Sequence, residues 1–186
     1  MTDPDIFARA PVYGLPKSFG ACALHPAQPA AIATLAPFRG QGIAVADALK
    51  KLWKTGLPKT GKTRTVKSVT LLWSAPGQWL ARGDFDPVAL ATALDGIAAV
   101  TDQSDAYAVL HLTGTDAADA MARLTPLDVA TLAGTDVART EIAALAGVVT
   151  PIKDGYEIWL PRSAAHWGVD RITGAMERLA AQRALG

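Results

Sequence analysis

The stretch from Val100 to Val129 (VTDQSDAYAVLHLTGTDAADAMARLTPLDV) constrains the fold more than any other part of the chain. Side chains alternate along a strand, so Tyr107, Val109 and His111 share one face of an extended segment. The alanines and leucines at the even positions from 106 to 112 share the other face. Because both faces are largely apolar, the pattern predicts a strand in the interior of a sheet.

A helix is expected directly after this strand. Gly114 ends the strand, and Thr115 is a suitable N-cap because its hydroxyl can accept a backbone N–H. Asp116 and Asp119 would stand in the first turn, where negative charge complements the helix dipole. Pro126 disfavours helical backbone at the residue before it and so ends the helix. The stretch therefore predicts a strand followed by a helix that folds back on the sheet.

The rest of the chain alternates between the two kinds of periodicity. Strands are predicted over residues 30–36, 66–74, 78–82, 139–149 and 156–160. Helices are predicted over residues 42–54, after an Asp86 N-cap, and after a Ser163 N-cap near the C-terminus. Hairpins and helices in this order predict an α+β fold with a mostly antiparallel sheet and packed helices. Residues 1–28 are proline-rich and predict an extended N-terminal arm, and residues 29–186 predict a single α+β domain.

Composition excludes several classes of protein. The net charge of +1 gives no overall attraction to nucleic acid or to an anionic membrane. Cys22 is the only cysteine, so disulfides within the chain and cysteine-rich zinc sites are excluded, and a buried small hydrophobe is its expected role. The first residues lack the apolar core of a signal peptide, and no apolar run reaches bilayer-spanning length. We therefore expect a cytoplasmic protein without nucleic-acid or membrane partners.

The segment Gly56–Thr63 (GLPKTGKT) matches the pattern of a phosphate-binding loop. Such a loop follows a buried strand and opens a helix, so that backbone N–H groups meet the phosphates. Here a helix precedes the motif and a strand follows it, which argues against a nucleotide site. Two other interpretations remain open: a mobile, solvated basic loop, or a positive loop that docks on an acidic partner.

Polar residues elsewhere form no complete catalytic set. His25, His111 and His166 are far apart in sequence, and His111 is expected to be a satisfied core or interface histidine. Arg139 and Glu141 are two residues apart on a predicted strand and share a face. They would either bind a polar ligand or line a solvated face. The sequence thus predicts no catalytic residue and no metal site.

Several short motifs, taken in order, resemble the sarcosine oxidase gamma subunit family. The clearest is VTDQSDAYAVLHLTG at residues 100–114, and the likeness continues through residues 117–128. Further matches lie at 138–141 and 155–163, and the family's hairpin is similar to residues 72–80. The resemblance covers about residues 66–180, whereas residues 1–60 match poorly.

The resemblance implies a function that composition does not show. The gamma subunit is one of four different chains of heterotetrameric sarcosine oxidase, an oxidoreductase complex. That enzyme demethylates sarcosine to glycine in a tetrahydrofolate-linked reaction of one-carbon metabolism. The expected partners are the alpha, beta and delta subunits. FAD, FMN, NAD and tetrahydrofolate are implied on the larger subunits and zinc on the delta subunit, so no cofactor is expected on this chain. The implied fold is that of the folate-binding aminomethyltransferase domain.

Three functions follow as hypotheses. The first is a non-catalytic gamma subunit of sarcosine oxidase, supported by the motifs and by the missing catalytic set. The second is a free-standing folate-binding protein of the aminomethyltransferase fold. Its candidate cofactor-binding residues are Asp102, Tyr107, Arg139 and Glu141. The third is a nucleotide-phosphate enzyme that uses the loop Gly56–Thr63.

Overall fold

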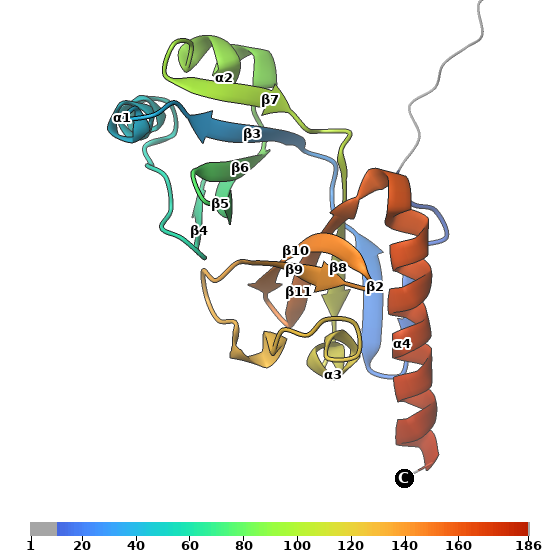
Figure 1. Ribbon diagram of the computed structural model, residues 1–186. Coiled ribbons are helices and arrows are strands. Elements are labelled where there is room, and N and C mark those ends of the chain that lie inside the picture. Colours follow the sequence, from blue (N-terminus) through green and yellow to red (C-terminus); the bar gives the residue numbers. More distant parts are fainter. Residues whose placement is uncertain (1–10, 186) are drawn as a thin grey trace, which may run out of the picture.

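The computed structural model describes residues 11–185 and has an α+β fold with two antiparallel sheets (Figure 1). We call the five-stranded sheet the β3 sheet and the six-stranded sheet the β8 sheet, after a strand within each. The β3 sheet has the order β4 (Thr63–Val66), β5 (Val69–Ala75), β6 (Gln78–Gly83), β3 (Ala31–Pro37) and β7 (Ala98–Asp102). The β8 sheet has the order β1 (Lys17–Phe19), β2 (Cys22–Pro26), β8 (Tyr107–Thr113), β11 (Gly155–Pro161), β10 (Leu145–Ile152) and β9 (Ala138–Ile142). The predicted α+β class is confirmed.

Helices cover the outer face of each sheet. Helices α1 (Gly42–Trp53) and α2 (Pro87–Ala93) pack on the β3 sheet. Helices α3 (Ala117–Met121) and α4 (Ala165–Leu185), with the short 3₁₀ turns η1 (Val129–Thr131) and η2 (Arg162–Ala164), belong to the β8 sheet. None of the helices among residues 11–185 is both long and apolar enough to cross a bilayer.

The inner faces of the two sheets meet each other. Their contact is a buried cluster that includes Leu72 and Leu80 from the β3 sheet and Val148 and Trp159 from the β8 sheet. Trp159 is completely buried there. The molecule is therefore layered as helices, sheet, sheet and helices, and the space between the sheets is the place where residues from both halves of the chain meet.

The alternation around His111 agrees with the prediction. Residues 108, 110 and 112 of β8 are fully buried beneath α3 and α4, while Tyr107 and Val109 pack against the apolar contact between the two sheets. β8 lies between β2 and β11, so it is an interior strand as expected. The Asp86 cap is also present, because its carboxylate accepts the backbone N–H of Val88 at 2.9 Å.

Three local predictions differ from the structure. Helix α3 begins at Ala117 with Asp116 as its N-cap residue and has no side-chain cap, so Thr115 does not cap it. Ser163 lies within the 3₁₀ turn before α4 rather than capping the helix. Residues 139–149 are not one strand, because Ala143 and Ala144 both take positive φ and form the turn between β9 and β10.

The described part of the predicted N-terminal arm is built into a sheet. β2 pairs with β8 over four residue pairs, from Ala23 opposite Thr113 to Pro26 opposite Leu110. Leu24 is fully buried in the core beneath α4. Residues 11–28 thus supply two strands of the β8 sheet, and residues 1–10 lie outside the described part of the chain.

Candidate functional site

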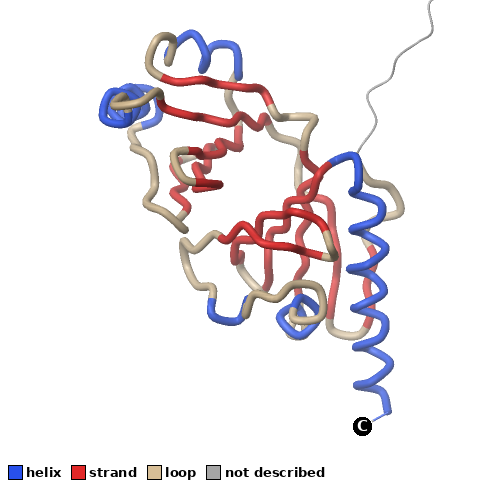
Figure 2. Tube along the Cα trace, viewed as in Figure 1, coloured by secondary structure: helices blue, strands red, loops and turns tan. Residues whose placement is uncertain are grey.

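A cavity of about 820 Å³ lies where the chain passes from one sheet to the other. The chain makes this passage twice, first between β2 and β3 and then between β7 and β8 (Figure 2). Both connections line the cavity, through residues 26–32 and through Ser104 and Asp105. Tyr107, Arg82 and Arg162 complete its polar lining.

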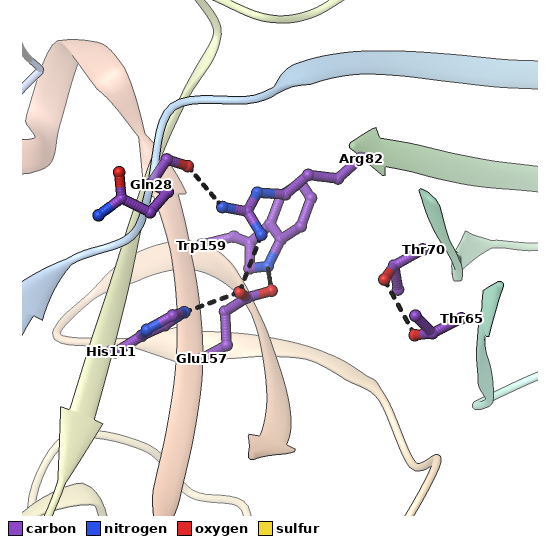
Figure 3. A network of polar contacts seen from close by, with 7 residues as sticks. All are labelled: Gln28, Thr65, Thr70, Arg82, His111, Glu157 and Trp159. Atoms are coloured by element: carbon purple, nitrogen blue, oxygen red, sulfur yellow. Dashed lines mark hydrogen bonds and ion pairs between the residues drawn. The ribbon is translucent and has the colours of Figure 1, made fainter. Parts of the chain in front are cut away.

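Arg82 reaches the cavity because of its position in β6. It is two residues beyond Leu80, whose side chain joins the apolar contact between the two sheets, so strand alternation directs Arg82 toward the β8 sheet as well. Its Nη2 donates to the backbone carbonyl of Gln28 at 2.8 Å. Its Nη1 lies 3.2 Å from Oε2 of Glu157, a residue of β11 (Figure 3). One side chain thus ties the β3 sheet both to the first connection and to the β8 sheet.

Glu157 is a buried carboxylate, and both of its oxygens have hydrogen-bond partners. Its Oε2 also lies 2.9 Å from Nε2 of His111, and its Oε1 accepts the indole N–H of Trp159 at 2.9 Å (Figure 3). We call Arg82, His111, Glu157 and Trp159 the inter-sheet cluster. These contacts satisfy the polar atoms that burial removes from water.

The ionisation of Glu157 reflects these partners. Burial alone would raise its pKa, because a desolvated carboxylate favours its neutral form. The hydrogen bond from His111, the charge of Arg82 and the hydrogen bond from Trp159 outweigh burial and hold the pKa below its ordinary value of 4.5. Glu157 is therefore an ionised partner for Arg82, and not a carboxyl group whose pKa is raised toward neutrality for acid–base catalysis.

The second connection is rigid. The backbone N–H and the hydroxyl of Ser104 both donate to Asp102, at 2.9 and 2.7 Å. These two bonds lower the pKa of Asp102. Ser104 Oγ also accepts the N–H of Ile32 at 3.1 Å, which joins the two connections. Arg162 forms an ion pair with Asp105 at 3.3 Å beside them.

The structure separates the four predicted ligand residues into two groups. Tyr107 lines the cavity, with its ring edge-on to Trp159 at a centroid distance of 5.7 Å. Asp102 lies next to the cavity wall in the turn that it forms with Ser104. Arg139 and Glu141 share a face as expected, but they are exposed on the edge strand β9 and do not line the cavity.

Sequence reasoning missed Arg82, Glu157 and Arg162. The sequence does contain a signal for Glu157, since it is the one charged residue in the otherwise apolar run Tyr156–Leu160. The sequence contains no such signal for Arg82, because arginine is common at the end of a predicted strand next to a polar loop. His111 was expected to be a satisfied histidine, and its contact with Glu157 fits that interpretation.

Other reactive groups of the described chain are already engaged or shielded. Cys22 is buried, and burial together with Asp116 and Asp119 raises the pKa of its thiol, so it is not an activated nucleophile. The His166 ring packs against that of Tyr13 at a centroid distance of 4.0 Å, tilted by 47°. Within residues 11–185, no three His, Cys, Asp or Glu side chains converge on a point that suits a metal ion. The cavity lining is mostly apolar, with Arg82, Arg162 and Asp105 as its charged residues.

The phosphate-loop motif does not have the geometry that nucleotide binding requires. Gly56–Lys62 connects α1 to the edge strand β4, and no helix begins at its end. The loop is also well anchored, because Trp79 Nε1 donates to the carbonyl of Pro58 at 2.9 Å. Lys62 is ion-paired with Asp136. The order of the elements thus argues against a phosphate site, and these contacts tie the loop to the rest of the fold.

Comparison with known proteins gives a consistent result for the fold. No protein-family model and no curated protein matches the sequence. Among solved structures, the chain is similar to one from a heterotetrameric sarcosine oxidase of Corynebacterium sp. U-96, with a TM-score of 0.75 and 21% identity over 88% of both chains. The fold is that of a sarcosine oxidase chain.

A second similar structure is the glycine cleavage system aminomethyltransferase T of Bartonella henselae. The TM-score is 0.62 and the identity 16%, over 84% of this chain but only 46% of the aminomethyltransferase. The predicted resemblance to a chain of heterotetrameric sarcosine oxidase and to an aminomethyltransferase is therefore confirmed at the level of the fold.

Proposed function

We propose that this chain is a non-catalytic, gamma-type subunit of a heterotetrameric sarcosine oxidase. The observation that carries the proposal is the reciprocal match to a sarcosine oxidase chain, which covers 88% of both chains. The match to the aminomethyltransferase, by contrast, leaves more than half of that protein uncovered. The likeness to a whole subunit favours a role inside an assembly.

The chemistry in and beside the cavity supports the same role. Glu157, the buried carboxylate behind the cavity residue Arg82, is neutralised by that arginine, and the hydroxyl of the cavity residue Ser104 is bonded to Asp102. Residues 11–185 therefore present no activated nucleophile and no acid–base pair in this cavity. In this proposal the flavins, NAD, tetrahydrofolate and zinc belong to the alpha, beta and delta subunits, and oxidation of sarcosine takes place there.

Co-expression tests the proposal. The tagged chain is produced together with the large sarcosine oxidase subunits of the same organism, and the complex is purified through the tag on this chain. We expect the large subunits to co-purify and to elute with it as one species. A chain that elutes alone while the large subunits assemble without it contradicts the proposal.

The cavity favours a second function, a free-standing folate-binding protein. A volume of about 820 Å³ accommodates a ligand of that size, and Tyr107, Arg82 and Arg162 offer stacking and anion contacts. Titration of the isolated chain with tetrahydrofolate tests this function, because Trp159 contacts Tyr107 and its fluorescence reports on the cavity wall. A saturable change supports it, and no change at high micromolar ligand rejects it.

A further inference from the structure

The positive charge of this chain is concentrated in one short segment. Six of its eight lysines lie between residues 50 and 67, together with Arg64, and no acidic residue lies among them. The whole chain nevertheless has a net charge of only +1, so the remainder is acidic overall. We call these seven residues the basic edge, and all of them are exposed: Lys50, Lys51, Lys54, Lys59, Lys62, Arg64 and Lys67.

The fold places these residues along one border of the molecule. Lys50, Lys51 and Lys54 stand at the C-terminal end of α1, which covers the outer face of the β3 sheet. Arg64 is opposite Leu71 in the register of β4 and β5, and residues opposite each other project to the same face. Since Leu71 packs beneath the helices, Arg64 lies on the α1 side of the sheet. β4 is the edge strand of the β3 sheet, so Arg64 and Lys67 lie at its border.

The backbone that carries the basic edge is held firmly. Lys62 and Asp136 form a β-bridge, and Val137 N donates to the carbonyl of Gly61 at 3.0 Å. With the Trp79 bond to Pro58, these contacts fasten the loop to a β-hairpin and to the other half of the molecule. A loop whose backbone is already held loses less backbone freedom on binding than an unattached loop would.

Most of these cations are not neutralised within the described chain. Lys50 is paired with Asp47 at 3.0 Å, and Lys62 with Asp136. Among residues 11–185, no carboxylate lies within ion-pair distance of Lys51, Lys54, Lys59, Arg64 or Lys67.

Two of the lysines occupy positions that the backbone reserves for other residues. Lys54 follows α1 with φ 59° and Lys67 turns the β4–β5 hairpin with φ 53°. Glycine or asparagine is favoured at both kinds of position, because a Cβ atom is strained in left-handed backbone. Stability alone therefore does not account for lysine at either place.

We propose that the basic edge is the docking surface for an acidic face of a large subunit in the assembly proposed above. The inference rests on that proposed function and adds to it the surface and the charge of the contact. An acidic protein surface fits better than a nucleic acid. Nucleic-acid grooves combine cations with exposed aromatic rings, but Trp53 is half-buried and packs on Phe85 at 5.3 Å. Leu52, which is 46% exposed beside Lys51, suits the mixed apolar and polar contacts of a protein interface.

The test compares two variants with the same change in net charge. One carries Lys51→Glu, Lys59→Glu and Arg64→Glu, and the control carries Arg39→Glu, Lys153→Glu and Arg178→Glu, all at exposed positions. Association with the large subunits is followed by surface plasmon resonance at several salt concentrations. We expect the first variant to associate at least about tenfold more slowly than the wild type at low salt, and the control to stay within about twofold.

A second pair of substitutions keeps the test independent of folding. Lys54→Gly and Lys67→Gly remove charge while relieving left-handed backbone. We expect the double variant to melt at the same or a higher temperature than the wild type and still to associate more slowly.

The outcomes separate the two proposals. Equal association of the wild type, the triple variant and the control overturns the docking surface and leaves the subunit proposal standing. No association of the wild-type chain with the large subunits contradicts both. Micromolar binding of a labelled 30-nucleotide strand, lost only in the basic-edge variant, assigns the surface to nucleic acid and also overturns the inference.

Discussion

The inter-sheet cluster and the basic edge both concentrate charge, and they are built in opposite ways. In the cluster, Glu157 is buried and each of its oxygens has a partner, one of which comes from the other sheet. On the basic edge the charges are exposed and mostly uncompensated within the described chain. The contrast indicates that the buried charges hold the two sheets in register, whereas the exposed charges are left for a partner.

The largest expected effect comes from breaking the cluster. Glu157→Ala leaves Arg82 and the indole N–H of Trp159 without their acceptor in the interior. Removing one partner of a buried pair costs about 3 kcal/mol, so we expect a loss of that size in the free energy of unfolding. Urea denaturation measures it. A loss below about 0.5 kcal/mol would show that the cluster does not hold the sheets together.

A double-mutant cycle sharpens the same point. Arg82→Met and Glu157→Gln are measured singly and together, because Arg82 and Glu157 contact each other across the sheets. Groups in direct contact couple by about 1 kcal/mol, so we expect the double variant to lose about that much less than the sum of the single losses. Strict additivity would mean that the ion pair contributes nothing to the sheet contact.

The pH dependence of the cluster follows from the lowered pKa of Glu157. A carboxyl group whose pKa is lower in the folded state stabilises the fold at pH values above its unfolded pKa. That stabilisation is lost as the pH falls below about 4.5 through the lower folded value. We therefore expect the difference in melting temperature between the wild type and Glu157→Gln to shrink as the pH falls below about 4.5. A difference that grows as the pH falls through that range would contradict the assignment.

The smallest effect is expected on the basic edge, and its sign is opposite. Lys54→Gly removes a Cβ atom from left-handed backbone at the end of α1. The relief exceeds the added entropy of the unfolded chain, so we expect a gain of about 0.5 kcal/mol in the free energy of unfolding. Chemical denaturation at high precision checks it, with Lys51→Ala as the matched control expected to change stability little. A loss on Lys54→Gly would show that Lys54 serves the fold.

The sequence predicted local structure better than the pairing of distant segments. The alternation of β8, the helix after Asp86 and the helix near the C-terminus are local patterns, and the structure has all three. β2 has no such pattern, because it is only five residues long and ends at Pro26. Its pairing with β8 could not be predicted either, since the paired residues are some 85 positions apart in the sequence. The turn at Ala143 and Ala144 was missed because alanine does not mark positive φ.

The candidate site shows the same limit more sharply. The sequence supplied Tyr107 and the turn at Asp102, which lie on adjoining elements. The contact between Arg82 and Glu157 could not be predicted from the sequence, because the two residues are 75 positions apart and meet only when the sheets stack. A cavity formed by two inter-sheet connections depends on the tertiary structure and has no sequence pattern of its own.

Native mass spectrometry of the co-expressed complex tests the central claim most directly. The chain has a mass of 19.4 kDa, which identifies it within a larger assembly. We predict one species whose mass contains the alpha, beta and delta subunits and one copy of this chain. An assembly of the large subunits without the 19.4 kDa component, together with the chain on its own, would contradict the assignment as a sarcosine oxidase subunit.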